Sequence, residues 1–277
     1  MRLSSTADLT ILLKRLQYRL MKRLVKNTLR RLGYDLVRYD PAPRITTNEM
    51  ESLADLSEEE RKIVELVKPF TVTSVARIAT LLNAINYLLA NGIHGDIAEC
   101  GVWRGGSMMA AALALLARGD TSRQLYLYDT YEGMSAPTDK DISHDGVSAA
   151  AQLRQEPRGV GVWCYAGLED VRKNLCSTGY PKDKIHFIKG KVEQTIPRTL
   201  PSGLALLRLD TDWYESTKHA LQHLFPVLQT RGVLILDDYG HWLGARKAVD
   251  EYFQAPKSKP YLHRIDCTGR LLVKNGS

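Results

Sequence analysis

The stretch from Leu204 to Tyr239 constrains the fold more than any other part of the 277-residue sequence. Two apolar runs, at 204–209 and 233–236, each end on a pair of carboxylates, and a helical pattern at 214–225 lies between them. A strand, a helix and a second strand of this length form a right-handed unit in which the two strands are parallel. We therefore expect both acidic pairs to lie at the same edge of an α/β sheet.

The four carboxylates that end these runs are Asp210, Asp212, Asp237 and Asp238. Neighbouring strands lie about 5 Å apart, so these side chains converge at the carboxyl edge, where open α/β sheets bind ligands. This much negative charge is costly without a cation, and oxygen-only ligands suit a hard divalent ion, above all magnesium. A structural interpretation stays open, because Asp212 with Glu215 is also a helix capping box and the DDYG sequence could form a turn.

The net charge of +7 is concentrated at the N-terminus, where residues 1–41 contain ten Lys or Arg and three Asp. The rest of the chain is balanced, so the basic pI says little about the site. Leucines recur at helical spacing among basic residues over 8–32, which predicts a basic amphipathic helix ended by Gly33. Such a helix can lie on an anionic membrane surface, or it can cover an apolar patch on its own domain or on a second subunit.

We expect no nucleic-acid partner, since no aromatic-rich basic platform accompanies the charge. Peripheral membrane contact through residues 8–32 and a homo-oligomer both stay open. The four cysteines show no zinc or disulfide pattern, and no apolar stretch approaches the roughly 20 residues of a membrane span. We expect a cytoplasmic protein, at the inner membrane surface if the helix binds lipid.

A glycine-containing turn follows the short strand predicted at 96–100, in the sequence GDIAECGVWRGGS, and leads into a helix at 107–118. The turn has an acidic residue, one further residue, Gly, three residues and a second Gly, at Glu99, Gly101 and Gly105. This spacing is not the GxGxxG pattern of dinucleotide binding, and it is commoner in proteins that hold a nucleoside without a pyrophosphate. A turn of this kind lets a ligand approach the backbone. Alternatively, Gly105 and Gly106 only permit close packing of helix and strand.

Asp129 ends the next predicted strand, at 124–129, where a carboxylate can accept hydrogen bonds from both ribose hydroxyls. The polar segment 134–161 that follows is long enough to be a lid or substrate loop, or else a surface excursion. Thr73 and Ser74 precede a predicted helix, so they either cap it or reach a ligand at the sheet edge.

Four motifs, IAECGVWRGGS, LYDTYEG, LRLDTDWYEST and LDDYG, stand in this order and together resemble the macrocin O-methyltransferase family over residues 71–253. The resemblance implies an α/β fold of the class I methyltransferase type: Rossmann-like, doubly wound, with a mostly parallel seven-stranded sheet whose last strand is antiparallel. It also implies magnesium-dependent methylation of a sugar hydroxyl by S-adenosyl-L-methionine, with a small-molecule or glycan acceptor as the expected partner. The expected organisation is a helical extension at 1–40, a helical cap and lead-in at 41–94, and the methyltransferase domain at 95–277.

Carried over to this sequence, the resemblance makes Asp210, Asp237 and Asp238 the ligands of Mg²⁺ and Asp212 the general base. The cofactor S-adenosyl-L-methionine would be held by residues around the glycine turn, the second strand and the start of the preceding helix: Glu99, Gly101, Gly105, Ser107, Asp129, Thr130, Thr73 and Ser74. Alternative bases are His144, His219, His223 and His241, of which His241, after the DDYG turn, is the one to keep in reserve.

Two other functions fit parts of the sequence. Residues 210–212 spell the DxD motif with which nucleotide-sugar glycosyltransferases hold a metal-bound diphosphate. Against this, the glycine turn and Asp129 precede the acidic unit, as they do in methyltransferases. The basic helix at 8–32 would alternatively suit a non-enzymatic, membrane-associated protein.

Overall fold

The computed structural model describes residues 53–155, 164–196, 198–254 and 260–276, together with Val25 and Thr28. The basic helix predicted at 8–32 therefore lies outside the described residues, except for Val25 and Thr28, which are helical. The chain divides into a unit of residues 1–44 and a compact unit of residues 45–277. Every element from residue 53 onward belongs to the second unit.

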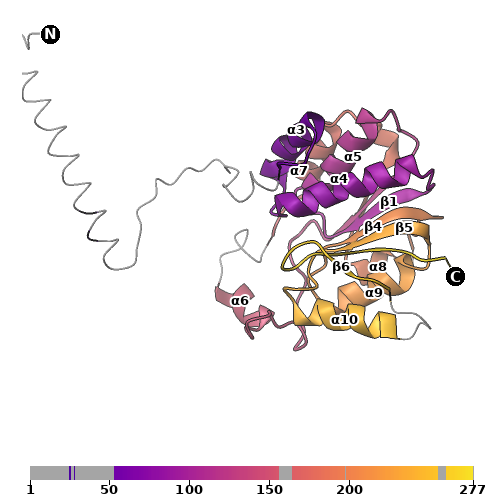
Figure 1. Cartoon of the computed structure of the whole chain (residues 1–277). Helices are drawn as coiled ribbons and strands as arrows, with labels where there is room; N and C mark the ends of the chain where they lie inside the picture. The colour runs from indigo at the N-terminus through magenta and orange to yellow at the C-terminus, as the bar shows by residue number, and fades with distance from the viewer. Residues whose placement is uncertain are drawn as a thin grey trace, which may run out of the picture. The chain divides into compact units, whose positions relative to one another are not determined.

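Within the described residues, seven strands form one sheet in the order β3-β2-β1-β4-β5-β7-β6 (Figure 1). The five strands from β1 to β5 are all parallel to one another, whereas β7 is antiparallel to both β5 and β6. Their bounds are β1 Asp96–Cys100, β2 Leu125–Asp129, β3 Ile185–Lys189, β4 Leu204–Leu209, β5 Leu228–Leu236, β6 His263–Arg264 and β7 Arg270–Val273. The predicted mostly parallel seven-stranded sheet is confirmed.

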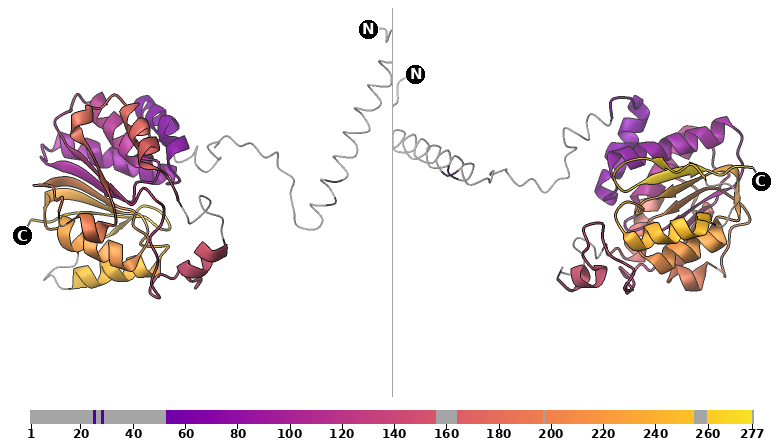
Figure 2. Two further views of the ribbon diagram at one scale, coloured as in Figure 1. Left: turned by 180° about the vertical axis from the view of Figure 1, so that it is seen from behind. Right: turned by 60° about the horizontal axis from the view of Figure 1, so that its bottom comes forward.

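Helices cover both faces of the sheet, as the views from the front and from behind show (Figures 1 and 2). One face carries α3 Glu58–Val67, α4 Val75–Ala90, α5 Gly106–Ala117 and α7 Leu168–Cys176, and the other carries α8 Val192–Thr195, α9 Tyr214–Leu224 and α10 Leu243–Gln254. Because side chains alternate along a strand, Leu206 joins the first apolar cluster and its neighbour Leu207 joins the second. A strand buried on both faces is apolar along most of its length, which explains the run of β4, where Arg208 is the one charged residue.

The helices before the sheet are part of its core. Ser57 and Glu60 form a capping box at the start of α3, and Ser74 caps α4 by accepting a hydrogen bond from the amide of Arg77. Leu82 and Ile85 of α4 are buried in the same cluster as strand residues. Consequently α4 is one of the helices that cover the sheet. None of the described helices is both long and apolar enough to cross a bilayer.

Two strands differ from their predicted bounds. β5 begins at Leu228, five residues before the predicted run, because the exposed residues 229–231 continue the strand without an apolar signal. The sequence also predicts a terminal hairpin of strands at 261–265 and 270–273 around Thr268 and Gly269. The hairpin forms, but β6 is limited to His263–Arg264. The polar segment after β2 contains a helix that the sequence does not indicate, α6, at Ala149–Gln155.

The strand order places a switch point at the centre of the sheet. The chain runs outward from β1 through β2 to β3, and it then returns to β4 on the other side of β1 before continuing to β5. The crevice at the carboxyl ends of β1 and β4 is therefore where an open sheet of this kind binds its ligand.

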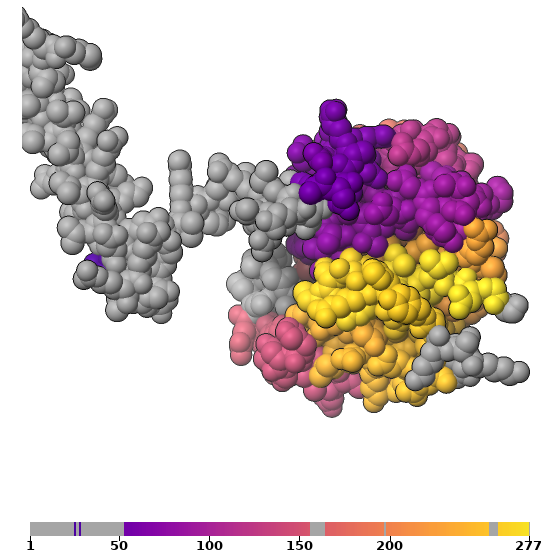
Figure 3. Space-filling view, in the orientation of Figure 1, coloured from indigo at the N-terminus to yellow at the C-terminus, as the bar shows by residue number. Residues whose placement is uncertain are grey.

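The C-terminal strands, yellow in the space-filling view, lie beside the purple region of α4 (Figure 3).

Candidate active site

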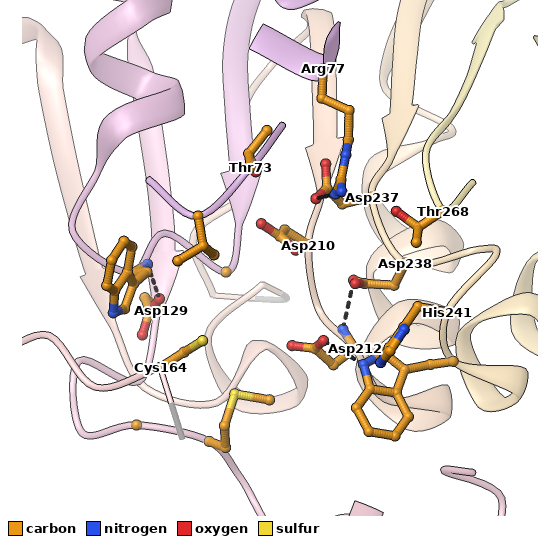
Figure 4. A pocket seen from close by; sticks show the side chains of 16 residues that line it. Thr73, Arg77, Asp129, Cys164, Asp210, Asp212, Asp237, Asp238, His241 and Thr268 are labelled. Carbon is orange, nitrogen blue, oxygen red and sulfur yellow. Dashed lines mark hydrogen bonds and ion pairs between the residues drawn. The ribbon is translucent and has the colours of Figure 1, made fainter. Parts of the chain in front are cut away.

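A cavity of about 440 Å³ opens at this edge of the sheet (Figure 4). Its volume lies in the usual range of small-molecule sites, about 300 to 1,000 Å³. Its lining residues come from the strand ends, the glycine turn, the segment after β2 and the turn between β6 and β7: Val72, Thr73, Arg77, Gly101, Trp103, Asp129, Gly133, Met134, Cys164, Asp210, Asp212, Asp237, Asp238, His241, Trp242 and Thr268.

All four aspartates of the acidic unit line this cavity. Leu209 pairs with Leu236 in the β4–β5 ladder, so the residues that follow them, Asp210 and Asp237, leave the sheet side by side. The convergence expected from the strand–helix–strand pattern is present. The alternative role of Asp212 as a helix cap is not, because α9 has no side-chain cap from its N-cap residue.

The side of the cavity that carries Asp210, Asp212, Asp237 and Asp238 is called the acidic side below. Arg208 is a buried cation among these carboxylates. It lies within β4, its side chain is 4% exposed, and its guanidinium reaches Glu99 at 2.6 Å, Asp210 at 2.9 Å and Asp237 at 2.7 Å. Thr73 Oγ1 accepts a further hydrogen bond from Arg208 Nη2 at 2.9 Å. Burial raises the pKa of Glu99 to about 8 against the opposing charge of Arg208. Arg208 was not among the residues predicted for the site, although a single arginine inside an apolar run that leads to the site indicates a buried charge with a role there.

Arg77 approaches the same carboxylates from the first turn of α4. Its guanidinium pairs with Asp237 Oδ2, and its Nε lies 2.8 Å from Asp266 Oδ2 on the turn between β6 and β7. Ser74 Oγ also donates to Asp266 Oδ2, at 2.8 Å. Asp237 is thus held by two guanidinium groups, and α4 is tied to the C-terminal hairpin. Sequence spacing gives no indication of this role for Arg77, which lies 160 residues from Asp237.

Among the described residues, Asp212 and Asp238 form no ion pair, whereas Asp210 shares Arg208 with Asp237. Burial, followed by the charges of the neighbouring carboxylates, raises the pKa of Asp210, Asp212 and Asp238. Asp212 has a left-handed backbone (φ 56°), and its amide donates to Asp238 Oδ2 at 3.0 Å. The indole N–H of Trp242 donates to Asp212 Oδ1 at 2.7 Å. A strained backbone and two aligned contacts therefore fix the direction of the Asp212 carboxylate.

The opposite side of the cavity is built on Asp129. Its Oδ2 accepts from the amides of Val102 (2.7 Å) and Trp103 (3.1 Å), and its Oδ1 accepts from the amide of Tyr131 at 2.7 Å. The glycine turn thus folds around this carboxylate. Gly101 also lines the cavity, and a side chain there would collide with the backbone carbonyl of Asp210, which an added Cβ would meet at 1.8 Å. Its backbone (φ +82°) brings the ends of β1 and β4 together.

Several predicted cofactor residues lie behind the cavity wall or beside it. Glu99, Gly105, Ser107 and Ser74 are not among the lining residues. At Gly105, whose backbone is left-handed (φ +89°), an added Cβ would lie 2.5 Å from Leu175, so the close approach at this glycine is between α5 and α7 and not between helix and strand. Thr130 lines a smaller adjoining cavity of about 80 Å³, which also contacts Asp129 and Asp210.

The segment between β2 and α6 is anchored to the acidic side through Asp141. Its Oδ1 accepts from the amide of Tyr214 at 2.7 Å, and its Oδ2 accepts from the amide and hydroxyl of Thr138. Asp141, rather than Asp212, therefore binds the start of α9. The same segment brings His144 beside His241, with ring centroids 5.3 Å apart. His241 lines the cavity, whereas His219 and His223 pack together on α9 and do not.

The acidic side has the donor chemistry for a hard divalent cation. Its groups are carboxylate oxygens, and Asp237 Oδ1 is buried without an aligned hydrogen bond from any described residue, although Arg208 Nη2 is close. In the described part of the chain, no three Asp, Glu, His or Cys side chains are already gathered as a metal centre requires. The residues fit the ion chemically, but the two arginines keep Asp237 engaged.

A seven-stranded sheet with this order, and a ligand-sized cavity with an acidic cluster at its switch point, are features of a class I methyltransferase. A sequence model of the macrocin O-methyltransferase (TylF) family matches residues 26–274. The chain therefore belongs to the macrocin O-methyltransferase family and is an S-adenosylmethionine-dependent O-methyltransferase.

Similar proteins agree with this assignment. The chain is 35% identical over 200 residues to the 8-demethyl-8-(2,3-dimethoxy-alpha-L-rhamnosyl)-tetracenomycin-C 4'-O-methyltransferase of Streptomyces olivaceus, covering 72% of this chain and 73% of that protein. It is 32% identical over 182 residues to the mycinamicin III 3''-O-methyltransferase of Micromonospora griseorubida, covering 66% and 69%. Among solved structures, the O-methyltransferase NovP matches with a TM-score of 0.64 and 27% identity, over 75% of this chain and 83% of that chain.

These findings do not support the two other functions considered from the sequence. A glycosyltransferase would use residues 210–212 to bind a diphosphate, whereas the family of this chain transfers methyl groups. A purely non-enzymatic role is likewise unsupported, because the relatives are named as enzymes.

Proposed function

We propose that this protein transfers a methyl group from S-adenosylmethionine to a hydroxyl of a sugar moiety on a glycosylated natural product, with the assistance of Mg²⁺. The names of two relatives, which methylate a rhamnosyl tetracenomycin and mycinamicin III, support the acceptor class. The observation that carries the proposal is the single cavity that has Asp129 on one side and four aspartates on the other.

The cofactor side binds the nucleoside part of S-adenosylmethionine. Asp129 accepts hydrogen bonds from the ribose hydroxyls: a carboxylate has about four acceptor positions, and three are taken by main-chain amides. The fourth has only a long contact from Thr130 Oγ1 (3.4 Å), whose proton has a closer acceptor in Gly133 O at 2.6 Å. Gly101 and Trp103 form the wall beside it, and Thr130 closes the adjoining cavity. Glu99, Gly105, Ser107 and Ser74 act indirectly, by holding the strand and helix that carry this wall.

On the acidic side, Asp210, Asp237 and Asp238 hold Mg²⁺. The ion would lower the pKa of the acceptor hydroxyl and orient it. The raised pKa values of Asp210 and Asp238, which follow from burial and from neighbouring carboxylates, support this placement because a cation relieves that repulsion. Asp237 joins the set only when it gives up its contact with Arg77.

Asp212 acts as the general base. Asp212 lines the cavity that the acceptor would enter, and the indole N–H of Trp242 holds its Oδ1. As the sugar oxygen forms its bond to the methyl carbon and the bond from that carbon to sulfur breaks, Asp212 takes the hydroxyl proton. Burial raises the pKa of Asp212, and a base with a pKa closer to neutrality accepts a proton more effectively in the transition state.

The test is a methyl-transfer assay on the full-length protein with S-adenosylmethionine, a panel of rhamnosyl glycosides and mass-spectrometric detection. We expect one methyl group to be added to a sugar oxygen, activity to fall on chelation with EDTA, and Mg²⁺ to restore it. Uridine diphosphate sugars serve as the control donor. Full activity after chelation would contradict the magnesium role, and methylation of the aglycone instead of the sugar would contradict the acceptor class.

A further inference from the structure

Asp237 is paired with two arginines that differ in their surroundings. Arg208 belongs to a buried strand, its side chain is 4% exposed, and it is also tied to Glu99 and Asp210. Arg77 is at the start of a helix, its side chain is 17% exposed, and it lines the cavity. Arg208 is therefore a fixed part of the core, whereas Arg77 reaches Asp237 from the side on which a ligand enters.

Arg77 also has a second carboxylate partner. Its Nε lies 2.8 Å from Asp266 Oδ2, and Asp266 Oδ1 is held by the amides of Gly269 (2.7 Å) and Thr268 (2.9 Å). Although burial opposes it, these amides and the charge of Arg77 lower the pKa of Asp266 to about 2. If the Arg77 guanidinium left Asp237, it would remain paired with Asp266. No buried charge would then be left without a partner.

We propose that Arg77 is an internal counter-ion for Asp237 that a divalent cation displaces, so that Arg77 sets the affinity of the site for metal. The proposal rests on the magnesium site of the proposed function and adds a residue to it. Two observations point to Asp237 as the contested group. Asp237 Oδ2 is occupied by Arg77. Asp237 Oδ1 is buried and lies 2.7 Å from Arg208 Nη2, but it receives no aligned hydrogen bond from any described residue.

The physical basis is competition between two cations for one carboxylate. A guanidinium at Asp237 neutralises the charge that would attract a metal, and its own charge repels the ion. Once displaced, Arg77 stays close because Asp266 retains it, and it can return when the metal leaves. The exchange also couples the metal to the contact between α4 and the β6–β7 turn, where Ser74 and Arg77 share Asp266.

The decisive experiment is a calorimetric titration of MgCl₂ into the full-length wild-type protein and its Arg77→Gln variant. Arg118→Gln is the matched control, because it removes the same charge from an exposed ion pair with Glu59 on the helical surface. We expect Arg77→Gln to bind Mg²⁺ about tenfold more tightly, a modest value for removing a unit charge a few ångströms from the ion. Arg118→Gln should bind Mg²⁺ as the wild type does.

Arg77→Lys keeps the charge but replaces the planar fork by a single ammonium, which cannot hold Asp237 and Asp266 with the same geometry. Its affinity for Mg²⁺ should lie between those of the wild type and Arg77→Gln. Thermal unfolding supplies an independent readout: without Mg²⁺ the Arg77→Gln protein should melt below the wild type, and saturating Mg²⁺ should raise its midpoint more, since stabilisation grows as the dissociation constant falls.

The outcomes separate this proposal from the proposed function. Equal Mg²⁺ affinity in the wild type and in Arg77→Gln would overturn the role of Arg77 and leave the magnesium site standing. Absence of Mg²⁺ binding in every variant would overturn both. Binding by Arg77→Gln alone, or tighter binding by it, supports the exchange.

Discussion

The two sides of the cavity treat their carboxylates in opposite ways. Asp129, on the cofactor side, accepts three hydrogen bonds from main-chain amides. On the acidic side, Asp210, Asp212 and Asp238 face one another, and burial together with their mutual charge raises the pKa of each. The Asp129 carboxylate is therefore held by hydrogen bonds within the protein itself, whereas Asp212 and Asp238 on the acidic side carry negative charge that a cation or a proton would relieve.

Replacing Asp212 with Asn should have the largest effect on catalysis. The variant keeps the shape and the acceptor for Trp242 but cannot take a proton, so we expect kcat to fall about 10²- to 10⁴-fold, the usual contribution of a general base. Steady-state kinetics with a saturating acceptor measures this. Asp183→Asn, at an exposed position, is the control, and a kcat for Asp212→Asn within a few fold of the wild type would assign the proton to another group, His241 first.

Replacing Arg208 with Met tests how far the acidic side depends on its buried cation. Glu99 would lose its ion-pair partner in the interior and Asp237 would keep only Arg77, and breaking a buried pair in this way costs about 3–5 kcal/mol. Urea denaturation measures the loss of unfolding free energy. Arg118→Met, which breaks the exposed pair with Glu59, should cost no more than about 1 kcal/mol. Similar losses in the two variants would mean that the Arg208 network is not what stabilises this side.

Arg208 and Arg77 show what the sequence can and cannot predict. The apolar runs and their acidic ends predicted β4, β5 and the meeting of Asp210 with Asp237, because parallel strands of one unit end at one edge. Arg208 carries a signal in the sequence, a charge inside a buried strand. Arg77 carries none, since its contact with Asp237 depends on how α4 packs across the sheet.

The glycine turn illustrates a similar limit. Its presence between β1 and α5 was predicted from the sequence, with ligand approach or close packing as the reason for its glycines. The segments that approach these glycines were not predicted. Gly105 is required by Leu175 and Gly101 by the carbonyl of Asp210. Close approaches between segments that are far apart in sequence leave no local pattern, so the sequence shows that a glycine is present and not what it touches.

Replacing Asp129 with Asn should weaken the cofactor side selectively. An amide can present only one acceptor oxygen where the carboxylate now accepts from amides on both of its oxygens. We expect the affinity for S-adenosylhomocysteine to fall about tenfold, in line with the loss of one hydrogen bond to a charged group, while the affinity for Mg²⁺ is kept. Calorimetric titration of both ligands measures this, and a joint loss of both affinities would show that the two sides are not independent.

The smallest effect concerns acid stability at the edge of the acidic side. The pKa of Asp266 is lowered to about 2 in the folded protein, below the ordinary value of about 3.9. Its contribution to stability is therefore present above about pH 4 and is lost as the pH falls toward 2. Chemical denaturation at a series of acidic pH values should show a shallower decline for Asp266→Asn than for the wild type, and parallel curves would contradict the assignment.

The most direct test of the division between the two sides is one pair of measurements on the Asp238→Asn protein. Asn keeps an acceptor for the amide of Asp212 but removes a charge from the proposed metal set. S-adenosylhomocysteine should bind to the variant within about threefold of its wild-type affinity, while methyl transfer falls at least about 100-fold, as expected when metal-assisted activation of the hydroxyl is lost. Undiminished methyl transfer, or a parallel loss of cofactor binding, would contradict the account.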